Sequence, residues 1–210
     1  MEINKENINF YSISSKKDFR KIQSNLEKIL EPTKLHVIHK KENNMYDDWN
    51  EYEHDKKKYK ELLEKVEAGE ELEISVSCAE VNGKIVGHVF MVKGEQYVKE
   101  FLDKINYREE IENIEQYAVV EAFVIQKEYR GLGFKMMYQH VLPKILENGI
   151  KKVLVSSSHA KAFPVYDRAG KMIYEGFHLS DHKIYYRLSK RWLIDIEKLI
   201  EGWQKNGRNI

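Results

Sequence analysis

Hydrophobic and polar residues alternate along the chain in patterns that predict a mixed α/β fold. From Leu72 the period changes to two, with Ile74, Val76 and Cys78 before Asn82-Gly83, and the segment Ile85 to Val92 follows the turn. A period of two is typical of strands, and Asn-Gly favours a two-residue type I′ turn, so this segment is predicted to be a β-hairpin. Residues 8–13 have the pattern of a further strand.

Two apolar runs in the second half predict strands buried on both faces. Tyr117 to Ile125 is apolar throughout except for Glu121, and Val153 to Ser157 is a shorter run of the same kind. Continuous apolar runs are typical of central strands that helices cover on both sides. Helices are predicted at 133–148 and 160–169, and residues 174–179 and 183–188 are predicted to be two closing strands.

Other segments have a helical period. A helix after residue 13 is expected to end at Pro32, and Leu35 to Ile38 is a short β-prone run. Residues 46–68 form a charged helix whose aromatic residues either pack in the core or shape an acceptor site. Residues 94–116 are a polar, partly helical insertion, and residues 191–204 are predicted to be a C-terminal amphipathic helix.

These elements fit one mixed central sheet flanked by helices, in a single domain over residues 1–210. The net charge of +1 gives no reason to expect a nucleic-acid partner. The single cysteine excludes an internal disulfide, and no run approaches the ~20 apolar residues that span a bilayer. We therefore expect a soluble cytoplasmic protein with no membrane partner. No His, Cys and Asp cluster has metal-ligand spacing, so no metal is expected.

The segment with the clearest chemistry is the junction after residue 125. Arg130-Gly131-Leu132-Gly133 lies between a predicted strand and a predicted helix. A helix N-terminus exposes unpaired amides, glycine lets the main chain approach a ligand, and arginine pairs with phosphate oxygens. The spacing is neither that of a P-loop nor that of a dinucleotide-binding loop. The alternatives are a phosphate site and an ordinary helix start with two glycines.

The residues around this loop resemble the Gcn5-related N-acetyltransferase (GNAT) superfamily. Ile125 followed by Arg130-x-x-Gly133 matches its first signature, and Ala162, Tyr166 and Gly170 fall at the spacing of its second. The resemblance covers roughly residues 74–188. Lys135, His159 and Lys171 depart from the signatures, which marks a divergent member.

The resemblance implies a sheet that splays after the strand 117–125 and a site for acetyl-coenzyme A. It implies transfer of the acetyl group to a primary amine of a small molecule or a peptide, without a covalent enzyme intermediate. The main chain of Phe123, Val124 and Ile125 is expected to pair with the pantetheine arm. The residues expected at the cofactor are Arg130, Gly131, Leu132, Gly133, Phe134, Lys135, His159 and Tyr166.

Two residues are candidates for catalysis. Tyr166 is expected to give a proton to the departing thiolate, unless it is only a packing residue. Glu121 is either the base that takes the ammonium proton or a structural ion pair or substrate anchor, since an acid within an apolar strand is costly unless it is paired or solvated. The competing class of function is a non-catalytic module that binds acyl-coenzyme A, and a longer acyl donor is a further possibility.

Overall fold

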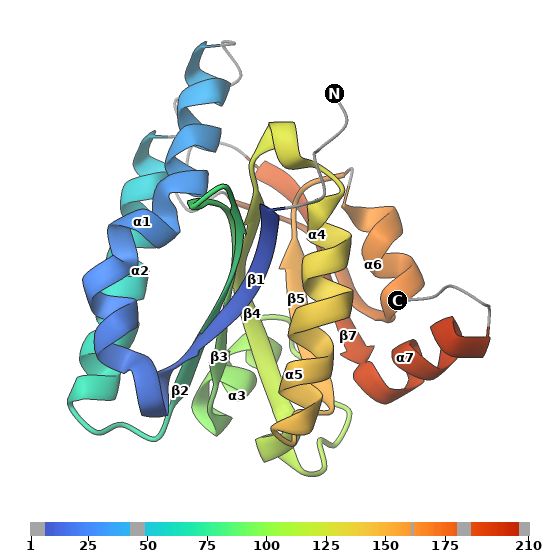
Figure 1. Ribbon diagram of the computed structural model, residues 1–210. Helices are drawn as coiled ribbons and strands as arrows, with labels where there is room; N and C mark the ends of the chain where they lie inside the picture. The colour runs from blue at the N-terminus through green and yellow to red at the C-terminus, as the bar shows by residue number, and fades with distance from the viewer. Residues whose placement is uncertain (1–6, 43–48, 161, 180–185, 206–210) are drawn as a thin grey trace. The chain divides into compact units, whose positions relative to one another are not determined.

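The computed structural model of the chain describes residues 7–42, 49–160, 162–179 and 186–205 (Figure 1). Its seven strands form a mixed sheet flanked by helices, as the sequence predicts. The strand order is β1 (Ile8–Ser14), β2 (Glu73–Val81), β3 (Lys84–Lys93), β4 (Tyr117–Ile125), β5 (Lys152–Ser157), β7 (Tyr186–Asp195) and β6 (Lys171–Leu179).

The chain divides into two compact units that interleave in sequence. The first unit comprises residues 1–91 and 122–141, and the second comprises residues 92–121 and 142–210. The division falls within β4, so Tyr117–Glu121 belong to the second unit and Ala122–Ile125 to the first. A single domain over residues 1–210 stays a prediction.

In the first unit, β1 pairs antiparallel with β2 from Ile8↔Val81 to Ser14↔Ser75. The turn between β2 and β3 is the predicted type I′ turn, since Asn82 and Gly83 have φ of 52° and 79°. Two long helices, α1 (Ser15–Glu42) and α2 (Trp49–Glu67), pack together beside these strands (Figure 1). Tyr59 of α2 stacks on Phe90 of β3, with ring centroids 4.2 Å apart.

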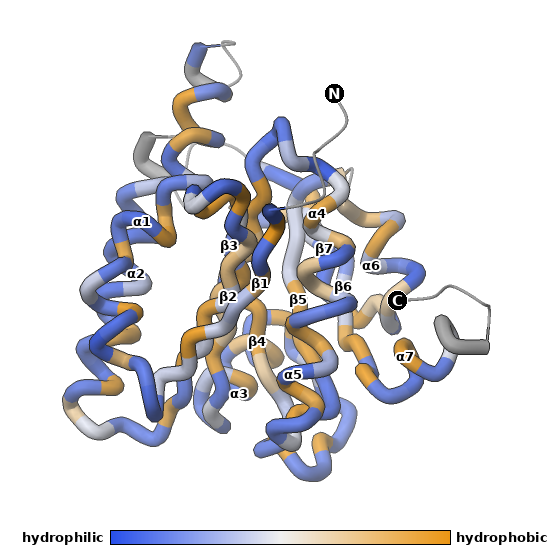
Figure 2. Tube along the Cα trace, in the orientation of Figure 1, coloured by the Kyte–Doolittle hydropathy of each residue, from blue (hydrophilic) through white to orange (hydrophobic). Residues whose placement is uncertain are grey.

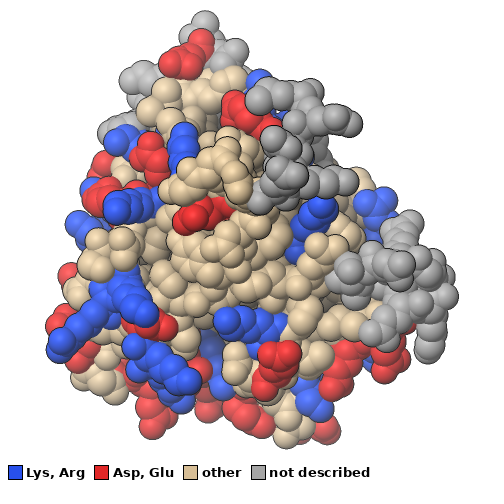
Figure 3. All heavy atoms as spheres, viewed as in Figure 1, with Lys and Arg blue, Asp and Glu red and all other residues tan. Residues whose placement is uncertain are grey.

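The helices α1 and α2 are amphipathic. Figure 2 shows hydrophobic and hydrophilic residues interspersed along both. Over these helices, Figure 3 shows basic and acidic side chains next to one another. Between the two helices, Lys56 and Glu27 form an ion pair at 2.6 Å. The mixed charge agrees with the near-neutral composition and gives this surface no strong single sign.

Pro32 lies inside α1, so the prediction that this helix ends there is wrong, and Leu35 to Ile38 are helical. Proline costs a helix interior about 3 kcal/mol, through a lost main-chain hydrogen bond and a steric clash. The buried face of α1 continues beyond it with Thr33 and Val37, which are 5% and 1% exposed. Packing of this face outweighs the local penalty.

In the second unit, β5 is central. It pairs parallel with β4 from Tyr117↔Lys152 to Val120↔Val155 and antiparallel with β7. The helix α6 (Phe163–Ala169) covers one face, where Trp192 of β7 donates from its indole nitrogen to Asp167 at 2.8 Å. The helix α3 (Glu95–Asp103) lies on the other face, beneath Arg191. The partly helical insertion at 94–116 is thereby confirmed.

The C-terminal helix predicted at 191–204 is wrong in its first turn. Residues 191–195 continue β7, and the helix α7 spans Ile196–Lys205. Trp192 and Ile194 are 0% and 1% exposed while their neighbours are less buried, which is the alternation of a strand. Their cross-strand partners in β5 supply a packing surface that a helix period does not reveal. Residues 180–185, with the first part of the predicted strand 183–188, lie outside the described residues.

Candidate active site

The loop after β4 is anchored to β3 within the first unit. The main-chain nitrogen of Gln126 donates to the carbonyl oxygen of Val86 at 2.8 Å, and the Gln126 side chain is buried. A 3₁₀ turn, η3 (Lys127–Tyr129), follows and closes with a bond from Tyr129 to the Gln126 oxygen at 3.0 Å. The chain therefore leaves the strand in a fixed direction before the two glycines.

Gly131 begins the next helix, α4 (Leu132–Lys135), in a left-handed conformation. Its φ is 103°, no side chain caps the helix start, and a Cβ at this position would meet nothing within 4 Å. The main chain thus turns sharply with open space beside it, and the first-turn amides have no side-chain acceptor. This arrangement fits a phosphate group, because amides at a helix N-terminus carry partial positive charge.

Gly133 has a different reason to be glycine. A Cβ there would lie 3.1 Å from Cζ of Phe123 and 3.3 Å from Cγ1 of Ile125. The start of α4 therefore rests directly on the end of β4, and three of the residues predicted at the cofactor are in contact. Gly87 of β3 also approaches this strand, since its Cβ would lie 2.9 Å from the Val124 carbonyl oxygen.

Two exposed cations flank the helix start. Arg130 precedes Gly131, and Lys135 ends α4. Phe134 is 48% exposed and contacts Tyr138, with ring centroids 4.4 Å apart, whereas Leu132 is 4% exposed. Of the residues predicted in this loop, Leu132 is thus a core residue by its side chain, whereas Arg130, Phe134 and Lys135 are exposed.

The helix then passes into a π-helical segment, η4 (Met136–Val141). A π-helix contains an extra residue per turn and is frequently found at functional sites. Here Nε2 of His140 lies 3.0 Å from Oγ of Ser12 in β1, which in turn lies 2.8 Å from Oγ of Ser77. The sequence predicts a regular helix at 133–148 and gives no signal for this network.

Glu121 belongs to the second unit, at the point where the parallel pairing ends. The β4–β5 register stops at Val120↔Val155, although β4 continues to Ile125 and β5 to Ser157. The pairing with β5 thus ends five residues before the C-terminus of β4. Glu121 is partly exposed and interacts electrostatically with Arg191.

Arg191 is a functional candidate that the sequence does not reveal, because residues 191–204 are predicted to be helical. Its guanidinium carbon lies 4.6 Å from the centroid of the Phe101 ring and 5.9 Å from that of Tyr174. Burial lowers the pKa of this guanidinium, and the charges of Tyr174 and Glu121 oppose that shift. A cation held in a half-buried aromatic setting interacts strongly with any anion that reaches it.

Tyr166 lies on α6 and is 9% exposed. Its ring contacts the indole of Trp192, with centroids 5.0 Å apart. His159 is exposed at the turn before α6, and its main-chain nitrogen donates to Oγ of Ser157 at 3.2 Å. Tyr166 and His159 belong to the second unit and the glycine loop to the first, so their meeting at one cofactor stays a prediction.

No group of three His, Cys, Asp or Glu residues in the described part of the chain could hold a metal ion. Cys78 is fully buried, and burial raises the pKa of its thiol to about 11, so the thiol is protonated at neutral pH. In the described ranges, no helix is long and apolar enough to cross a bilayer.

The anchored loop and the left-handed glycine belong to a chain with a mixed seven-stranded sheet. The profile of the acetyltransferase (GNAT) family matches residues 36–170, well over half of the chain, and the protein belongs to this family. Its sequence matches no curated protein significantly.

Solved structures are similar to this chain at low sequence identity. A probable acetyltransferase from Staphylococcus epidermidis is 10% identical with a TM-score of 0.58, over 90% of this chain and 98% of that chain. An IAA acetyltransferase from Bacillus cereus is 12% identical with a TM-score of 0.48, over 90% of this chain and 99% of that one.

Proposed function

We propose that the protein transfers an acetyl group from acetyl-coenzyme A to a primary amine of a small molecule or peptide. The observation that carries the proposal is the uncapped helix start at Gly131, with its open space and adjacent Arg130, in a chain of the GNAT family. The pyrophosphate would bind the first-turn amides and Arg130, with Lys135 as a second cation. Bound acetyl-coenzyme A would supply the thioester.

The transfer requires that the amine lose two protons and the sulfur gain one. Glu121 takes the first proton from the ammonium, which leaves a lone pair on nitrogen. That nitrogen forms a bond to the carbonyl carbon, and the bond between carbon and sulfur then breaks. The Tyr166 hydroxyl protonates the leaving thiolate, and the second proton from nitrogen restores the tyrosine. Protons placed in this way commonly contribute 10²–10⁴-fold to a rate.

The buried setting of Tyr166 supports this role, because contact with Trp192 holds its ring in one orientation. Positioning of a donor in this way avoids an entropic cost during the reaction. The partial exposure of Glu121, where the β4–β5 pairing ends, gives its carboxylate access to an acceptor.

The test combines binding and turnover on the full chain. Coenzyme A is expected to raise the melting temperature, and acetyl-coenzyme A with a panel of primary amines is expected to release thiol and give the N-acetyl product by mass spectrometry. A rise in melting temperature without product from any amine would favour the non-catalytic binding module. No rise and no product would contradict both functions.

A further inference from the structure

The face of the second unit that carries α3 holds a row of three polar residues on neighbouring strands. Ser156 of β5 lies directly opposite Arg191 of β7, and Glu121 of β4 follows the last β4–β5 pair, Val120↔Val155. Adjacent strands are about 4.8 Å apart, so the main chains of Glu121 and Arg191 are roughly 10 Å apart with Ser156 between them.

All three side chains point to the same face. Tyr117, Leu154 and Leu193 line one small hollow on this face, together with Leu102 of α3. Side chains alternate along a strand, so residues two or four positions away from these share the face. Glu121, Ser156 and Arg191 meet that condition on their respective strands.

The row is open to solvent at its centre. Ser156 is exposed, whereas its strand neighbours Leu154 and Val155 are each 1% exposed. A small hydroxyl between two long, oppositely charged side chains leaves room above it. Directly after the buried residues Val153 to Val155, this is the place where a small molecule could reach the sheet.

The guanidinium at one end of the row is held in place, and its Nε has no hydrogen-bond partner within the described part of the chain. Among the described residues, the only hydrogen bond of the Arg191 guanidinium is donated to the main-chain oxygen of Phe101. Glu121 also acts on Arg191 through its charge. A guanidinium carries five N–H donors, and a half-buried one is best stabilised by a carboxylate in its plane.

We infer that this row binds a small amine that also carries a carboxylate, with the free α-amino acids as the substrate class. The carboxylate binds Arg191 and the ammonium lies at Glu121, above the small side chain of Ser156. The rings of Phe101 and Tyr174, which already contact the guanidinium, form the wall on the far side of the arginine. The inference rests on the proposed acetyl transfer and names its acceptor.

The arrangement also gives the ammonium the correct partner for reaction. When the carboxylate of the amino acid is held by Arg191, its nitrogen is the end directed to Glu121. The Glu121 carboxylate, which binds the ammonium group of the amino acid, is then also the group that takes a proton from it. An amine without a carboxylate would lack the contact that sets this orientation.

The experiment compares three amines that share one side chain and differ at the carboxylate: leucine, leucinamide and isoamylamine. The same comparison is made with the corresponding phenylalanine and methionine series. With acetyl-coenzyme A saturating, kcat/KM for the amino acid is expected to exceed that for the amide about 10- to 100-fold, the range for a charged hydrogen bond. In Arg191→Gln the preference is expected to fall below about threefold, because kcat/KM falls much more for the amino acid than for the amide. Lys152→Gln removes a cation from the same face, beside Tyr117, and should keep the preference.

Each outcome separates this inference from the proposed function. Acetylation of the amides and simple amines as fast as of the amino acids would overturn the inference and leave acetyl transfer standing. An equal loss for all three amines in Arg191→Gln would also overturn it. No product from any amine would overturn both. If Arg191→Gln does not fold, the inference is tested by the preference of the wild type for the amino acid over the amide and by the same preference in Arg191→Lys.

Discussion

The imidazole of His140 lies 3.0 Å from the hydroxyl of Ser12, a residue 128 positions earlier in the chain. The contact joins the π-helical segment η4 to the strand β1, and Ser12 extends it to Ser77 of β2. The extra residue of the π-helix changes which side chains of this segment face the sheet. Three segments far apart in sequence are thereby linked through one hydroxyl.

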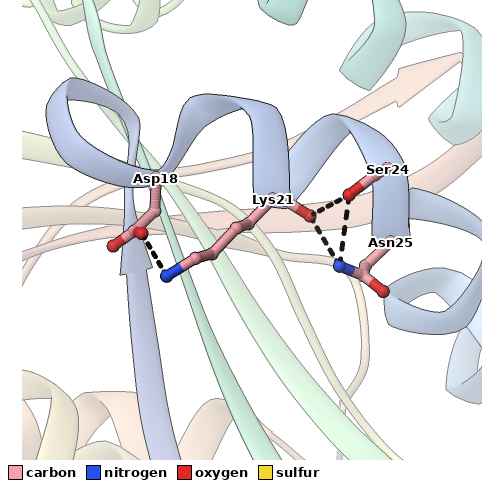
Figure 4. A network of polar contacts seen from close by, with 4 residues as sticks. All are labelled: Asp18, Lys21, Ser24 and Asn25. Carbon is pink, nitrogen blue, oxygen red and sulfur yellow. Dashed lines mark hydrogen bonds and ion pairs between the residues drawn. The ribbon is translucent and has the colours of Figure 1, made fainter.

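Ser12→Ala is expected to lower the free energy of unfolding by about 1–2 kcal/mol, because it removes a shared partner from two polar groups in a partly buried place. Urea denaturation followed by circular dichroism measures the change. Ser24→Ala is the matched control, since the Ser24 hydroxyl is exposed and bonds only within α1, to the carbonyl oxygen of Lys21 and the Asn25 amide (Figure 4). An equal loss in the two variants would show that the Ser12 network adds no stability.

His88 makes the first unit sensitive to acid. It is fully buried in β3, and burial lowers its pKa to about 4 against the opposing effect of the Ile29 main chain. Between pH 6.5 and pH 4 the unfolded chain therefore binds a proton at His88 that the folded chain does not. Above pH 6.5, protonation of His88 does not affect the free energy of unfolding. As the pH decreases below 6.5, this free energy falls by up to about 1.4 kcal/mol per pH unit.

In His88→Leu, the free energy of unfolding is expected to depend less steeply on pH over that interval than in the wild type. Denaturant titrations at several pH values between 4 and 7 give the two slopes. Phe90→Leu, a fully buried and non-titrating position two residues later, should lower stability without changing the slope. Parallel curves for wild type and His88→Leu would contradict the assignment.

The contact of Gly133 with β4 predicts a compensating pair of substitutions. Gly133→Ala places a methyl group against Phe123 and Ile125, so the start of α4 or the Phe123 ring must move. We expect a loss of about 1–2 kcal/mol in stability from overpacking and weaker binding of coenzyme A. Adding Phe123→Leu removes the nearest atom, Cζ. The double variant should therefore recover much of the lost stability and much of the lost affinity for coenzyme A.

Calorimetric titration of coenzyme A and thermal melts measure the two quantities. Phe123→Leu alone is the control, since by itself it creates space and should also lower stability. The interpretation requires that the double variant lose less stability and less coenzyme A affinity than the sum of the losses in the two single variants. Simple additivity would mean that Gly133 and Phe123 do not compete for the same space.

Arg130 and Tyr166 should affect different steps. Arg130→Ala is expected to raise the Kd of coenzyme A about tenfold, as one charged hydrogen bond would, with a smaller effect at high salt. Tyr166→Phe keeps the ring against Trp192 and should lower kcat about 10²-fold with Kd nearly unchanged. Titration calorimetry and steady-state kinetics separate the two, and a similar fall in melting temperature for both would instead identify core residues.

Local signals in the sequence predict the parts of the fold that local geometry decides. Asn82-Gly83 specifies its turn because both residues adopt positive φ, and the bounds of β4 follow from its apolar run. The glycines of the loop are also predicted, although their reasons differ: Gly131 needs its backbone conformation and Gly133 needs space.

Parts of the structure that depend on distant partners are not predicted. Trp192 appears on a helical face in the sequence, yet its place in β7 is fixed by pairing with Val155 and by packing under α6. Because this strand is missed, Arg191 is missed with it. His140 likewise reaches its partner Ser12 only because its segment is π-helical, and no residue pattern predicts a π-helix there.

Burial of the one cysteine has a practical consequence. Cys78 is the only thiol of the chain and is fully buried, and burial raises the pKa of this thiol to about 11. A chromogenic disulfide reagent should therefore react with released coenzyme A and leave the folded enzyme unmodified. A cysteine introduced at exposed Ser156 would become the single reactive position of the protein, and the rate of its alkylation would report whether an amino acid occupies the polar row.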